Sequence, residues 1–80
     1  SAVTIFPNPA SNYFNITVDE KIEAGMEVKI YNALGILVHV SFMEASSTVV
    51  NTSKFADGLY MVQLKSNGKT MKTARLTIAN

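Results

Sequence analysis

Histidine is the side chain best suited to acid–base chemistry at neutral pH, and this chain has a single one, His39. Cysteine is absent, which excludes thiolate nucleophiles, thiolate zinc ligands and disulfides. A hydrolytic triad needs a nucleophile and an orienting acid beside the histidine, and a metal site needs several converging ligands. His39 shares a strand face with Leu37 and Ser41, which supply neither set. We therefore expect His39 at an ordinary surface or edge position.

The acidic residues also lack a catalytic or metal-binding pattern. Asp19, Glu20 and Glu23 cluster in one loop, but calcium loops alternate oxygen ligands with a glycine and this loop does not. A solvated loop is the favoured interpretation. The chain has no phosphate loop, nucleotide fingerprint or nucleophile elbow, and an 80-residue domain has little room for a deep catalytic pocket. The sequence therefore predicts a protein that is not an enzyme, with no catalytic, metal or cofactor-binding residue.

Three basic residues gather near the C-terminus, at Lys69, Lys72 and Arg75. Strand alternation predicts Lys69 and Arg75 on one face and Lys72 on the other. They could protect an edge strand from pairing with another chain, or they could form a basic strip that a receptor reads. The net charge of the whole chain is only +1, which argues against nucleic-acid binding.

Two tyrosines, Tyr13 and Tyr31, occupy outward positions in their strands. Exposed aromatic rings can form a flat platform for a sugar. The simpler interpretation is that each ring shields the second face of a sheet while its hydroxyl reaches water. We favour the simpler interpretation.

The elements that must position these side chains are strands, because apolar residues recur with a period of two. With 48% hydrophobic residues and 80 residues in all, we expect one domain with one core. The longest apolar run is about half of the roughly 20 residues that a membrane helix needs, so we expect no membrane insertion. Seven strands are predicted, at residues 3–6, 13–18, 26–31, 36–42, 48–51, 59–66 and 69–78. This spacing predicts an all-β antiparallel sandwich with immunoglobulin-like architecture, and a closed barrel is the structural alternative.

Turn residues separate these strands. Asn67-Gly68 is a strong hairpin signal, and Gly35 supplies a left-handed position in a second hairpin. Pro7-Asn8-Pro9 forms a stiff corner, so the first strand should end at about Phe6. In the fourth strand, Ile36, Val38, Val40 and Phe42 share the apolar face and are expected to be buried.

The order of these motifs resembles a known family. The chain reads "IFPNPASNYFNI", "VKIYNALGILV", "NTSKFADGLYMVQL" and "NGKTMKTARLTI", and is similar to the C-terminal sorting domain of the type IX (Por) secretion system of Bacteroidetes. The matching positions are Phe6, Pro7, Asn8, Pro9, Tyr31, Gly35, Gly58, Tyr60, Gly68, Lys69 and Lys72. The chain departs from the family where Ile36 follows Gly35, and where it ends in Ala79-Asn80.

The resemblance implies that residues 1–80 are a non-catalytic secretion signal at the C-terminus of a larger cargo precursor. Such a domain folds in the periplasm and directs the cargo through the outer-membrane translocon. A sortase-like peptidase then typically removes it at the cell surface. The implied partners are translocon components, this peptidase and the upstream cargo domain. Lys69, Lys72 and Arg75, with the exposed edge of the last strand, are the expected recognition residues. The alternatives are a retained adhesion or carbohydrate-binding module and a small hydrolytic domain.

Overall fold

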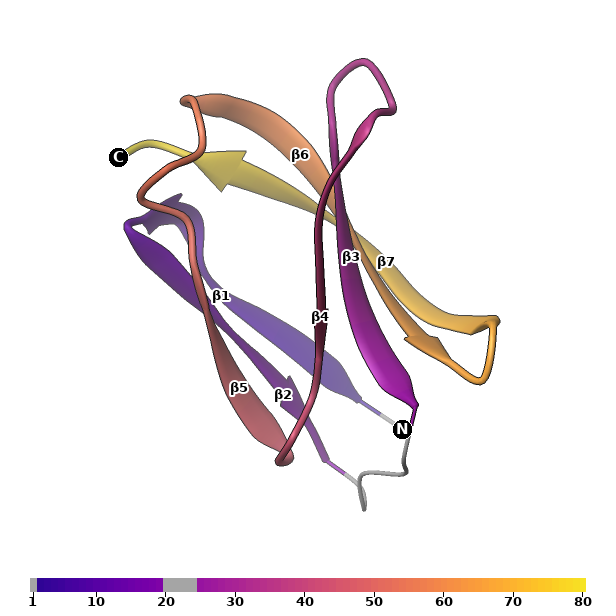
Figure 1. Ribbon diagram of the computed structural model, residues 1–80. Coiled ribbons are helices and arrows are strands. Elements are labelled where there is room, and N and C mark those ends of the chain that lie inside the picture. Colours follow the sequence, from indigo (N-terminus) through magenta and orange to yellow (C-terminus); the bar gives the residue numbers. More distant parts are fainter. Residues whose placement is uncertain (1, 20–24) are drawn as a thin grey trace.

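The computed structural model describes residues 2–19 and 25–80, and these fold into strands joined by short turns (Figure 1). The strands are β1 (Val3–Ser11), β2 (Tyr13–Val18), β3 (Met26–Asn32), β4 (Leu37–Phe42), β5 (Ser47–Asn51), β6 (Gly58–Ser66) and β7 (Lys69–Ile78). The predicted strands are confirmed, with most ends within one residue. Within the described ranges, no helix is long and apolar enough to cross a membrane.

The strands form two layers that share β1. One layer is β4-β3-β6-β7 and the other is β1-β2-β5, and neighbours within each layer run antiparallel. The first half of β1 pairs with β2, from Val3 opposite Val18 to Phe6 opposite Asn15. Further along the same strand, Ala10 pairs in parallel with Ile78 of β7. β4 and β5 stand at the two ends of the strand order, so the described strands form an open sandwich rather than a closed barrel.

The core fills the space between the two layers. Period-two alternation places every second apolar side chain of each inner strand on this face. The side chains with less than 2% exposure include Phe14 and Ile16 from β2, Val28 and Ile30 from β3, Val62 and Leu64 from β6, and Leu76 and Ile78 from β7. All of them were predicted to face inward.

The fourth strand faces the opposite way from the prediction. Val38, Val40 and Phe42 are 38%, 45% and 57% exposed, whereas His39 and Ser41 are half-buried. The turn at Asn32–Ile36 sets Leu37 opposite Tyr31, but the next paired residues are His39 and Ile30. The residue left over in β4 is Val38, which forms a β-bulge. One extra residue moves the side chains of the rest of the strand to the other face of the sheet. No residue pattern in the sequence predicts this bulge.

The Pro7-Asn8-Pro9 corner does not end β1, which continues to Ser11. Both bonds preceding the prolines are cis. The Asn8 side chain takes the place of a peptide group beside β7, because its Oδ1 accepts from Thr77 N–H at 3.0 Å and its Nδ2 donates to Arg75 O at 3.0 Å. The prediction of a strand end at Phe6 was therefore wrong. A side-chain amide supplies hydrogen bonds that proline nitrogens cannot donate.

Candidate recognition surface

The three basic residues of β7 are all exposed, but they do not lie on the predicted faces. Leu64 pairs with Lys72 and Lys65 with Thr70, so Met71 is an extra residue in β7. This bulge places Lys69 opposite Ser66 and Lys72 opposite Leu64, on one face of the sheet. Arg75 lies opposite Met61 on the other face. The prediction that Lys69 and Arg75 share a face was wrong because the bulge changes the phase of the strand.

The edge of β7 is open only along its first half. β6 pairs with one side of the strand, and β1 covers the other side toward the C-terminus through Asn8 and Ala10. Among the described residues, the uncovered stretch runs from 69 to 74. The exposed edge expected for the last strand is therefore confined to its first half, beside Lys69 and Lys72.

The outer face of the four-stranded layer carries aligned rows of side chains. The strand registers place Leu37, Tyr31, Met61 and Arg75 in one row across β4, β3, β6 and β7. The next row contains Val40, Lys29, Gln63 and Thr73. Lys29 Nζ lies 3.7 Å from Glu27 Oε1, which is the single ion pair between described residues. This face therefore combines apolar side chains with the Arg75 guanidinium at its β7 side, and that guanidinium forms no ion pair with another described residue.

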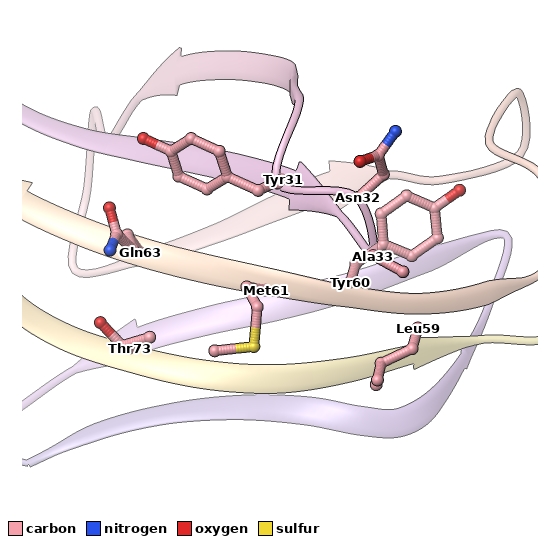
Figure 2. Close-up of a pocket in the computed structure, with 9 residues that line it drawn as sticks. Tyr31, Asn32, Ala33, Leu59, Tyr60, Met61, Gln63 and Thr73 are labelled. Carbon is pink, nitrogen blue, oxygen red and sulfur yellow. The ribbon is translucent and has the colours of Figure 1, made fainter.

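A shallow hollow of about 330 Å³ lies on this outer face. Figure 2 shows Tyr31 and Asn32 of β3 above Met61 and Gln63 of β6, with Thr73 of β7 beyond them. The Tyr31 ring forms one wall of the hollow. Tyr13 lies on β2 in the other layer, so the two tyrosines form no common platform and the favoured interpretation of separate shielding rings fits their positions.

His39 lies beside a second hollow, of about 270 Å³, at the open side between β4 and β5. Its Nε2 is 3.0 Å from Ser41 Oγ, and its ring packs edge-on against Phe55 with centroids 6.0 Å apart. Burial lowers the pKa of the His39 imidazole below its usual value near 6.5, so the ring is neutral at pH 7.

A hydrolytic site at His39 would need an acid that orients the ring. Glu44 lines the same hollow, but no hydrogen bond joins its carboxylate to the imidazole. The predicted edge position of His39 is confirmed, although its side chain faces the interior. Within residues 2–19 and 25–80, no group of three or more acidic or histidine side chains could hold a metal.

The predicted acidic loop lies mostly outside the described residues, which include neither Glu20 nor Glu23. Asp19 is described, and its Oδ1 accepts a hydrogen bond from Ala2 N–H at 2.8 Å. This contact ties the end of β2 to the start of β1.

The sequence of residues 4–79 matches the family model described as the secretion system C-terminal sorting domain. This chain belongs to that family. The match spans both layers of the sandwich, from β1 to the end of β7. The predicted type IX sorting function is thereby confirmed, and it assigns the protein to export toward the cell surface or the extracellular space.

The chain matches part of one larger relative in sequence and part of one larger solved chain in fold. It is 36% identical over 75 residues to an endo-acting ulvan lyase of Formosa agariphila, covering 90% of this chain but only 14% of that enzyme. Its fold matches a solved chain from a study of PorZ, an essential bacterial surface component of the type IX secretion system of Porphyromonas gingivalis. That match has a TM-score of 0.76 and 23% identity, and covers 98% of this chain and 11% of the other. The chain thus corresponds to a small part of each of these proteins.

The family motif residues of the sorting domain occupy turns and core contacts. Gly35 and Gly68 have φ of 82° and 81°, in the region that favours glycine, and Asn67 precedes Gly68 with φ of 51°. Tyr60 is buried, and its hydroxyl donates to Ala56 O at 2.7 Å. These positions therefore maintain the fold of the sorting domain.

The residue that sequence reasoning missed is Asn80. Its Nδ2 donates to Thr52 O at 2.7 Å and to Phe55 O at 2.9 Å, and its Oδ1 accepts from Asn12 N–H at 2.8 Å. One amide thus joins the turn between β1 and β2 to the segment between β5 and β6. An asparagine after the last strand carries no local signal of this role, because all three partners are distant in sequence.

Proposed function

We propose that residues 1–80 are the C-terminal sorting signal of a larger cargo precursor. The domain folds in the periplasm, directs the cargo through the type IX outer-membrane translocon, and is then removed by a sortase-like surface peptidase. The observation that carries this proposal is the family match over residues 4–79. The low coverage of the ulvan lyase, 14%, supports an upstream cargo as the remaining part of such a precursor.

The proposed recognition residues are Lys69, Lys72 and Arg75, together with the open edge of β7. Lys69 and Lys72 lie on one face of the sheet and Arg75 on the other. The uncovered edge at residues 69–74 lies between these two faces. An incoming strand that pairs along this edge would have side chains on both faces, and so could reach all three cations. Pairing along the edge would therefore allow one partner strand to contact all three cations. A partner docked on one face of the sheet could not do so.

Charge reversal of Lys69, Lys72 and Arg75 to glutamate tests this surface. We expect a fused reporter carrying the triple variant to remain inside cells with an active type IX system, because the reversed charges would repel an acidic receptor strand. The matched control reverses Lys29, Lys54 and Lys65, which changes the net charge by the same amount. Thermal melting of both variants establishes that they fold. Normal export of a folded triple variant would contradict the proposed recognition set.

The mass of the exported reporter distinguishes a cleaved sorting signal from the alternative function, a retained carbohydrate-binding module. Removal of the domain leaves a reporter without these 80 residues. A retained carbohydrate-binding module would leave them attached, and the hollow beside Tyr31 is the feature that favours this second candidate.

A further inference from the structure

β4 is an edge strand without the usual protection against pairing. It stands at one end of the strand order, and among the described strands its neighbour is β3 alone. Natural edge strands are commonly protected by lysine, proline or inward-pointing charges. The stretch from Ile36 to Phe42 contains no charged residue and no proline. Its outward side chains Val40 and Phe42 are about half exposed.

The backbone of β4 is available for pairing at these same residues. Met43 N–H donates to Met26 O at 3.0 Å, which identifies this pair as hydrogen-bonded. Hydrogen-bonded pairs alternate along an antiparallel ladder, so Ser41 and His39 are the next residues whose backbone groups face β3. The backbone groups of Val40 and Phe42 therefore face away from the sheet.

We propose that two copies of this chain associate through β4, antiparallel about a two-fold axis at Val40. In this register Val40 lies opposite Val40 of the second copy, and Phe42 lies next to the Val38 bulge of that copy, where the regular ladder ends. His39 lies opposite Ser41 on the other face. On the regular part of this ladder, Val40 meets Val40 on the outer face and His39 meets Ser41 on the inner face, with no like charges facing each other.

Because the residues of β4 match those of an antiparallel copy of β4, we favour a second copy of this chain over an unrelated strand as the partner. The two-fold operation carries the apolar outer face of β4 onto itself and joins the four-stranded layers of both copies into one continuous sheet. The association also stops at a dimer, because each copy has one β4 edge and the pairing occupies it. The Val38 bulge limits the regular ladder at the end of the strand near the β3–β4 turn. The inference concerns the chain in solution and does not depend on the proposed export function.

The test is the mass of the 80-residue chain in sedimentation velocity over a concentration series. We expect a monomer–dimer equilibrium for the unaltered chain. Val40→Lys should remain at the monomer mass of 8.7 kDa at concentrations where the unaltered chain is dimeric, because two lysines would meet on the axis. The matched control is Val49→Lys on the opposite edge strand β5, where Val49 is 62% exposed. It should dimerise like the unaltered chain.

Two further measurements keep the result independent of any folding defect. An equimolar mixture of Val40→Lys and Val40→Glu should regain the dimer mass, because position 40 meets itself across the axis. The chain has no cysteine, so a Val40→Cys variant should form a disulfide-linked dimer under mild oxidation and Val49→Cys should not. A monomeric unaltered chain, a fully dimeric Val40→Lys variant, or equal cross-linking at both positions would each overturn the proposal.

Discussion

Replacing Phe14 by alanine should remove about 3–5 kcal/mol from the free energy of unfolding, the usual cost of deleting a buried phenylalanine ring. Phe14 is the largest fully buried side chain, with 0% exposure, and it lies in the core between the two layers. A domain of this size has a total stability of about 4–12 kcal/mol. The substitution therefore removes a large share of the stability.

Urea denaturation followed by circular dichroism measures this loss. The matched control is Tyr13→Ala, the adjacent aromatic residue of β2, which is 45% exposed on the outward face. We expect its cost to stay below about 1 kcal/mol, because a half-exposed ring loses little burial. Equal losses for the two variants would contradict the assignment of the inner and outer faces of β2.

The second large effect is expected at Asn80. Asn80→Ala removes the amide that contacts Thr52 O, Phe55 O and Asn12 N, and leaves these backbone groups without that partner. We expect a loss of about 2–3 kcal/mol, since each bond contributes about 0.5–1.5 kcal/mol and water can reach part of the site. The measurement is the midpoint of urea unfolding.

Two controls separate this bridge from a general loss of asparagine. Asn15→Ala removes a single hydrogen bond of 3.5 Å to Phe6 O and should change stability by less than about 0.5 kcal/mol. Asn80→Asp keeps an acceptor for Asn12 but places a carboxylate oxygen against the carbonyls of Thr52 and Phe55. It should lose at least as much stability as the alanine variant. A stable Asn80→Asp variant would show that the two donated bonds contribute little.

The strand pattern and the fold class were predictable because period-two alternation is a local property of the sequence. The inward residues of β2, β3 and β6 follow it without interruption. β4 and β7 do not, because bulges at Val38 and Met71 each insert one residue into the ladder. A bulge reverses the face of the residues on one side of it, and neither valine nor methionine marks one.

The candidate surface was predictable in its residues but not in its arrangement. Their charge and their position in the strand suffice to predict that Lys69, Lys72 and Arg75 are exposed to solvent. Their division between two faces depends on the Met71 bulge, and the length of free edge depends on where Asn8 meets β7. Both depend on contacts between segments that are distant in the sequence. The same holds for Asn80, whose partners lie 25 or more residues away.

The most direct test of the type IX sorting function is the export of a reporter that carries this domain at its C-terminus. The reporter is expressed in a bacterium with an active type IX system and in the same strain with the translocon inactivated, and its amount is measured at the cell surface and in the medium. We predict export only when both the domain and the active translocon are present, and no export of the reporter alone. Retention of the fusion by the active strain, or its equal export by the inactivated strain, would contradict the assignment of this domain as a type IX sorting signal.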